Sequence, residues 1–99
     1  MKVKAKAGAA GTKVKMLIQH VMETGRRKDD AGKLIPGHYI TEVTATHKDE
    51  IVFHAELGPA VSKDPYLAFK FEGAASGDML TVAWVDNKGK SDMSEVAIR

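Results

Sequence analysis

The sequence predicts an all-β protein, a sandwich of two antiparallel sheets. Apolar and polar residues alternate along most of the chain, which is typical of strands with one face turned inward. Turn residues separate the alternating stretches about every 8 to 12 residues, and no stretch has the apolar stripe of a helix. A chain of 99 residues has the size of one domain with one core.

The first strand is expected over Thr12–Val21. Its alternation turns Val14, Met16 and Ile18 to one side and polar residues to the other. Leu17 breaks this pattern because it lies on the polar side. The strand therefore has a core-facing side and an outer side with one apolar residue.

Residues 1–11 are expected to form a flexible segment ahead of a domain over residues 12–99. Lys2, Lys4 and Lys6 interrupt every apolar run there. A secretory signal needs about 7 to 15 consecutive apolar residues and a membrane helix about 20. We therefore expect no membrane insertion, and export would require earlier cleavage or a partner polypeptide that carries the signal.

Two further strands are expected between Tyr39 and Leu57, joined by a hairpin turn over His47–Glu50. The second of them sorts its residues by face. The face expected in the core holds Ile51, Phe53, Ala55 and Leu57, and the opposite face holds Val52, His54 and Glu56.

Three more strands complete the prediction, over Tyr66–Glu72, Met79–Asp86 and Met93–Ile98. The first turns Leu67, Phe69 and Phe71 inward. A tight turn precedes the last strand, with Gly89 in the left-handed position. The number and spacing of the strands favour an immunoglobulin-like β-sandwich.

The strand over Met79–Asp86 is apolar on both faces. Trp84 alternates with Leu80 and Val82 and is expected as a central packing residue. The other face should be polar if it met water, yet Ala83 and Val85 lie on it. Leu17, Ile40 and Val52 are also expected on outer faces. These residues indicate a second buried surface supplied by another protein, although scattered apolar surface residues are common.

Two long loops remain. Residues 22–37 are expected to form a solvated loop, because basic and acidic side chains compensate one another there. The loop over Gly58–Pro65 has two prolines that limit its freedom, and it suits either a docking loop or a sandwich crossover. The residues expected to bind a partner are Leu17, Pro59, Val61, Pro65, Tyr66, Ala83 and Val85.

Composition excludes several kinds of chemistry. The chain has no cysteine, so it forms no disulfide and carries no sulfur covalently on a thiol. Its four histidines show no pair at metal-ligand spacing, and no nucleophile or phosphate-binding motif is present. We expect no catalytic residue, metal or cofactor. A net charge of +2 does not favour nucleic-acid binding.

Three segments carry a family resemblance: Met22–Thr44, Gly58–Gly73 and Trp84–Ser91. They closely resemble SoxZ, the Z subunit of the SoxYZ sulfur carrier complex of bacterial thiosulfate oxidation. The resemblance spans about Thr12 to Ile98. Val21 departs from the family pattern, because many relatives have proline at this position.

The resemblance implies a non-catalytic subunit that forms a periplasmic heterodimer with SoxY, whose cysteine carries the sulfur intermediates. It also implies transient contacts with other sulfur-oxidation enzymes and export together with SoxY. Which enzymes are contacted, and whether two copies self-associate without SoxY, stays open. The alternative is a stand-alone β-sandwich enzyme or metal-binding domain that acts on sulfur compounds.

Overall fold

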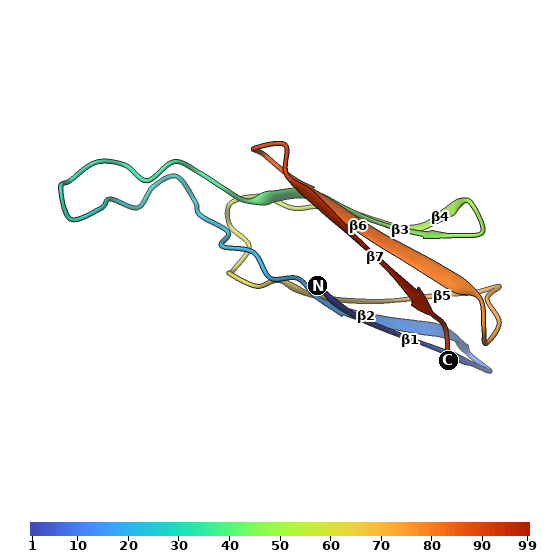
Figure 1. The fold of residues 1–99 in the computed structure, drawn as a ribbon. Helices are drawn as coiled ribbons and strands as arrows, with labels where there is room; N and C mark the ends of the chain where they lie inside the picture. Colours follow the sequence, from blue (N-terminus) through green and yellow to red (C-terminus); the bar gives the residue numbers. More distant parts are fainter.

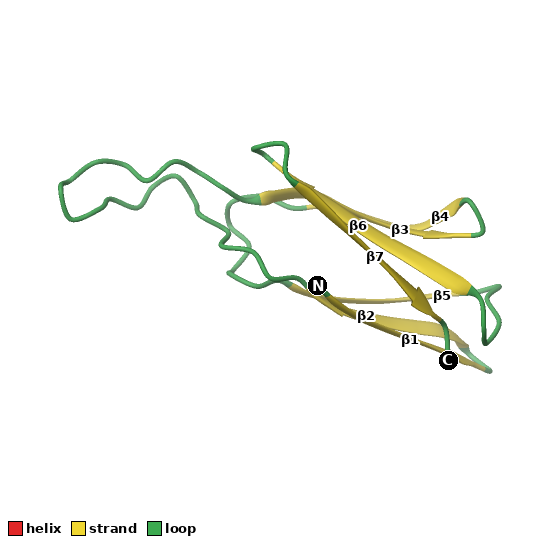
Figure 2. Cartoon of the chain, viewed as in Figure 1, coloured by secondary structure: helices red, strands yellow, loops and turns green.

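The computed structural model describes residues 1–99 and contains seven strands and no helix that could span a membrane. The strands are β1 (Lys2–Gly8), β2 (Gly11–Leu17), β3 (Ile40–His47), β4 (Glu50–Glu56), β5 (Tyr66–Phe71), β6 (Met79–Asp86) and β7 (Ser91–Ala97). They form two antiparallel sheets, in the orders β1-β2-β5 and β4-β3-β6-β7, that lie one over the other (Figures 1 and 2). The predicted immunoglobulin-like sandwich is confirmed.

The core lies between the two sheets and is formed by the inward-facing residues of the strands. On β2 the fully buried apolar side chains are Val14 and Met16, as the alternation predicts. On β6 they are Leu80 and Val82, whereas Trp84 is only half-buried, at the border of the core. Burying a side chain such as leucine or valine stabilises the fold by about 1.5–3 kcal/mol.

The N-terminal segment is not the flexible end that the sequence suggested. Residues Lys2–Gly8 form β1, which pairs along its whole length with β2. Val3 and Ala5 face inward between outward lysines. The alternation was missed because small residues and lysines make a weak pattern, and the pairing with β2 makes the segment a strand. Arg99 also bonds to the backbone of β1.

The hairpin between β3 and β4 is confirmed, with a two-residue turn in which Lys48 and Asp49 both have positive φ. The assignment of faces on β4 is partly wrong. A register shift after Ala45 places Ile51 outside, where it is 67% exposed, and lets Val52 pack against the core. A bulge reverses the side-chain phase of the strand that carries the extra residue.

Ile40 was expected on an outer face but is fully buried at the start of β3. The ladder between β3 and β6 shifts register between Ile40 and Glu42. Because of this shift, the alternation of inward and outward residues along the rest of β3 does not continue back to Ile40. The sequence shows no sign of such a shift.

Residues 22–38 form an arm that projects beyond the sandwich (Figure 1), and the molecule has principal-axis extents of 54 × 20 × 17 Å. This segment was expected to be a solvated loop. Instead its two limbs pair through the bridges Glu23–His38 and Lys28–Leu34. Leu34 is 61% exposed near the tip. The arm is therefore a paired hairpin with a solvated surface.

Candidate functional site

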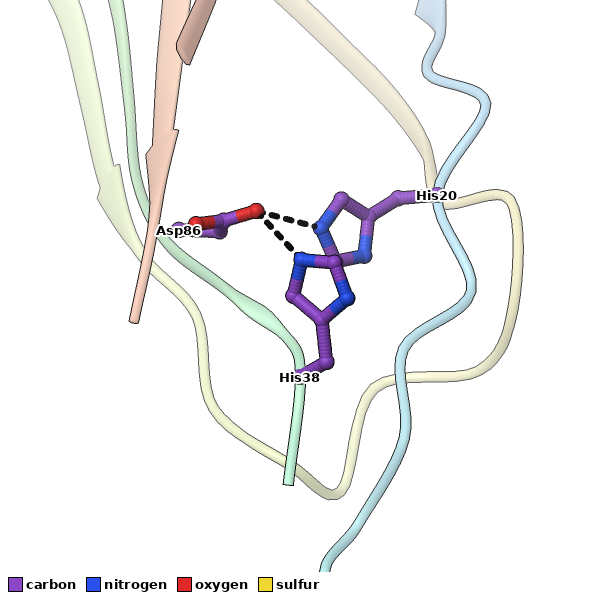
Figure 3. A group of neighbouring side chains, drawn as sticks. All are labelled: His20, His38 and Asp86. Atoms are coloured by element: carbon purple, nitrogen blue, oxygen red, sulfur yellow. Dashed lines mark hydrogen bonds and ion pairs between the residues drawn. The ribbon is translucent and has the colours of Figure 1, made fainter. Parts of the chain in front are cut away.

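Three polar side chains meet where the arm joins the sandwich (Figure 3). His20 follows β2, His38 precedes β3, and Asp86 ends β6. The two Nε2 atoms lie 3.1 Å and 2.6 Å from the same carboxylate oxygen of Asp86, Oδ2. His20 and Asp86 are buried and His38 is partly buried. The cluster thus joins both limbs of the arm to the four-stranded sheet.

Asp86 is an ionised carboxylate inside the protein. Its other oxygen accepts hydrogen bonds from the backbone N–H groups of Lys88 and Lys90, each 2.9 Å long. Burial by itself would raise the pKa of Asp86, but the hydrogen bonds from both histidines and from these two N–H groups outweigh it. The pKa of Asp86 is therefore held well below its usual range. The carboxylate holds the arm and the β6–β7 turn together.

The cluster has the residue types that bind transition metals, and its ligand atoms lie within 4.8 Å of one another. A neutral histidine that binds a metal through Nε2 must carry its proton on Nδ1. In His20, however, Nδ1 accepts a 3.1 Å hydrogen bond from the N–H of Met22. A metal would therefore require this bond to break, and the geometry favours a hydrogen-bonded anchor over a metal centre.

Sequence reasoning did not bring these residues together, because His20 and Asp86 are 66 positions apart. The available signal was the strand phase. His20 continues the inward alternation of β2, and Asp86 continues that of β6. A polar residue in an inward position needs a partner. The sequence therefore indicated that His20 and Asp86 each need a hydrogen-bonding partner. The packing of the two sheets shows that they are partners of each other.

A second histidine–aspartate pair closes the opposite end of the core. His47 ends β3, and its Nε2 lies 2.8 Å from Oδ2 of Asp78. The backbone N–H of Ala75 and then His47 lower the pKa of Asp78 below its usual value. Since the pair holds the β5–β6 turn against β3, its role is also structural.

The residues predicted to bind a partner divide between two sides of the molecule. Leu17 and Tyr66 are directly opposite each other on the outer face of the three-stranded sheet. Ala83 and Val85 lie on the outer face of the four-stranded sheet. The β4–β5 loop carries the others, with Pro59 exposed, Val61 half-buried and Pro65 buried. These residues do not form one continuous surface.

On the outer face of the four-stranded sheet, here the β6 face, apolar side chains lie mainly along β6 and the edge strand β7, and β3 contributes the polar residues Glu42, Thr44 and Thr46. The apolar side chains of the β6 face are Ile51, Met79, Ala83, Val85, Met93 and Ala97. Ile51 and Met93 are 67% and 65% exposed. Its charged residues are Glu42, Glu56 and Glu95.

The outer face of the three-stranded sheet, here the lysine face, is basic. It presents Lys2, Lys4, Lys6, Lys13, Lys15, Leu17, Tyr66, Ala68 and Lys70. No aspartate or glutamate faces outward within the three strands, and the exposed Glu72 follows β5 directly. The two outer surfaces of the sandwich therefore differ in charge and in apolar content.

Fold and site together define a small immunoglobulin-like β-sandwich in which buried histidine–aspartate pairs hold loops and arm in place. The family model described as "Sulphur oxidation protein SoxZ" matches residues 1–97, so the chain belongs to the SoxZ family. The match includes the N-terminal strand, which the three motifs did not cover. Membership implies a role in sulfur oxidation. No curated protein matches this chain.

Proposed function

We propose that this chain is the non-catalytic subunit of a SoxYZ sulfur carrier and that SoxY packs on the β6 face. The observation that carries the proposal is the row of apolar side chains along β6 and β7 on this face. In a lone two-layer sandwich, the outer positions of a strand such as β6 meet water and are polar. Here Ala83 and Val85 occupy them, beside the exposed Met93.

The composition of the β6 face resembles that of a protein–protein interface. Such interfaces have an apolar centre that is poor in charge, a polar rim, and more methionine than other surfaces. Met79 and Met93 lie on this face beside Ala83, and the polar outer residues of β3 flank them on one side. A partner sheet or loop packed there would remove the apolar side chains from water.

The absence of cysteine supports the division of labour between the two chains. A covalent sulfur intermediate needs a thiol, and this chain has none. The cargo must then be carried by SoxY. A second thiol close to a sulfur-loaded cysteine would attack it by exchange, so a thiol-free support also protects the intermediate.

The enzyme alternative receives little support from the buried cluster. A general base needs a nitrogen within reach of the substrate. In His20 both ring nitrogens are engaged, one by Asp86 and one by Met22. Turnover of thiosulfate by the purified chain alone would favour the enzyme alternative and contradict a purely supporting role.

The proposal is tested by co-purification of the chain with its SoxY. Val85→Asp would bury an unpaired carboxylate in the interface, so we expect loss of the complex. The matched control is Ala68→Asp, the same change of charge on the opposite side of the sandwich, and we expect it to leave the complex intact. Full binding by the Val85→Asp variant would exclude SoxY from this face. Unfolding of the isolated variant would instead identify Val85 as a core residue.

For localisation, we propose the periplasm, with export of the folded pair directed by SoxY. Expression with and without SoxY, followed by cell fractionation, tests this. We expect the chain in the periplasm only when SoxY is present. Periplasmic chain in cells without SoxY would contradict joint export.

A further inference from the structure

The strand register gathers lysines on one side of the molecule. β1 contributes Lys2, Lys4 and Lys6, β2 contributes Lys13 and Lys15, and β5 contributes Lys70. All of them are exposed and point outward from the three-stranded sheet, because the alternate residues of each strand face the core. This face is much more basic than a net charge of +2 suggests.

Several of these lysines are directly opposite one another in the ladder. Lys4 faces Lys15, while Lys13 lies between Lys6 on one side and Lys70 on the other. Like charges in opposite positions destabilise a sheet. None of these side chains takes part in an ion pair with a carboxylate of this chain. An acidic surface bound there would relieve the repulsion.

Protection of sheet edges explains only part of the pattern. Lysines on edge strands prevent edge-to-edge aggregation, and β1 and β5 are the two edges of this sheet. Lys13 and Lys15, however, lie on β2, which is paired on both sides. Edge protection needs no lysine on a central strand, so these two residues call for another explanation.

The lysine face also has a groove at its β1 edge and an apolar pair of residues at one end. The groove, of about 610 Å³, is lined by Lys4, Lys6, Lys13, Lys15 and Arg99 together with Val96 and Ala97 of β7. At one end of the face, Leu17 and Tyr66 form a directly opposed pair, and Tyr66 is 59% exposed. Tyrosine is enriched among residues that dominate binding energy in protein interfaces.

We propose that the lysine face is a docking surface for an acidic surface on another protein of the sulfur-oxidation system. The lysines steer the encounter, and Leu17 and Tyr66 supply an apolar anchor. A protein fits better than a nucleic acid, because a single aromatic residue provides no series of stacking platforms for bases. The face belongs to the sheet opposite the β6 face, so SoxY and this second partner can bind at the same time.

The test compares two triple variants with the same change in net charge. The first is Lys4→Gln/Lys13→Gln/Lys15→Gln on the lysine face. The control is Lys63→Gln/Lys88→Gln/Lys90→Gln, in loops away from this face. Association with each purified sulfur-oxidation enzyme is measured at low and high salt. We expect the first variant to lower the association rate constant at low salt by about tenfold or more for the acidic partner, with a weaker salt dependence, and the control to behave like the wild type.

Carbodiimide cross-linking gives an independent readout, since it joins a lysine Nζ to a carboxylate in direct contact. We expect cross-links to an enzyme carboxylate at Lys4, Lys13 or Lys15. Equal effects of the two triple variants, or cross-links confined to other lysines, would overturn the proposal. So would salt-sensitive binding to duplex DNA or anionic vesicles with no enzyme bound, or self-association through the glutamates of the β6 face. Co-purification with SoxY is measured on the same variants and should not change, which separates this proposal from the previous one.

Discussion

The two outer faces of the sandwich share one backbone geometry but differ in side-chain chemistry. The lysine face is basic and has Leu17 and Tyr66 at one end. The β6 face has exposed Ile51 and Met93, and its charged residues are glutamates. The alternation along a strand decides which positions face outward, but it does not decide which residue types occupy them. The composition of an outer face indicates what that face meets, and this difference is the basis of the two docking proposals.

The like-charge pairs show the same difference. The β6 face also has one pair of opposed carboxylates, Glu42 of β3 and Glu56 of β4, and β3 is likewise paired on both sides. On the lysine face the opposed pairs include Lys13 and Lys15 of the central strand. The β6 face therefore has one directly opposed like-charge pair, whereas the lysine face has three.

The largest expected effect comes from disrupting the buried cluster of His20, His38 and Asp86. Unfolding of the sandwich would remove both outer faces together. Asp86→Ala leaves two histidines and two backbone N–H groups without their acceptor, and removing one member of such a buried network costs about 3–5 kcal/mol. Urea unfolding measures the loss. Asp30→Ala, an exposed position in the arm, is the control and should change stability by less than about 0.5 kcal/mol. A similarly small loss for Asp86→Ala would show that the cluster is not the anchor.

A substitution at an exposed position separates the contribution of the β6 face to binding from its contribution to stability. Met93→Lys places a charge on the apolar surface, and we expect the affinity for SoxY to fall by about 2 kcal/mol, roughly 30-fold. The unfolding free energy of the isolated chain should hardly change, because Met93 is 65% exposed. Titration calorimetry gives the affinity. Tyr66→Lys, on the lysine face, is the control, and an equal loss with it would remove the distinction between the faces.

Acid should weaken the anchor. The pKa of Asp86 is lower in the folded chain than in the unfolded chain. The carboxylate therefore contributes stability that is fully present above its unfolded pKa of about 3.9 and is lost as the pH falls through its folded pKa. We expect the unfolding free energy to drop as the pH falls below about 4. The Asp86→Asn variant should show a shallower drop, and identical acid profiles would assign the effect to other carboxylates.

The smallest expected effect concerns repulsion on the lysine face. Lys13→Glu converts two like-charge pairs, with Lys6 and Lys70, into attractive ones. We expect the unfolding free energy to rise by about 0.2–1 kcal/mol at low salt, and the gain to shrink as salt screens the charges. Thermal unfolding at two ionic strengths measures it. Lys63→Glu, in the β4–β5 loop, controls for net charge, and an equal gain there would remove the evidence for local repulsion.

Much of the fold was predictable because alternation along a strand is a local property. The inward positions of Val14 and Met16, and of Leu80 and Val82, follow from the period of two residues alone. The turn after His47 follows from local composition. The lysine face was not predicted, since it became visible only once residues 2–8 were known to pair with β2.

By itself, the sequence determined most strand phases, most turns, the absence of a thiol and the family resemblance, because each depends on neighbouring residues or on composition. Tertiary structure decided the rest. The register shifts that expose Ile51 and bury Ile40 depend on which strands become neighbours. The meeting of His20, His38 and Asp86 depends on how two sheets pack. Such contacts join residues far apart in the chain, and only the free energy of the whole packed core selects them.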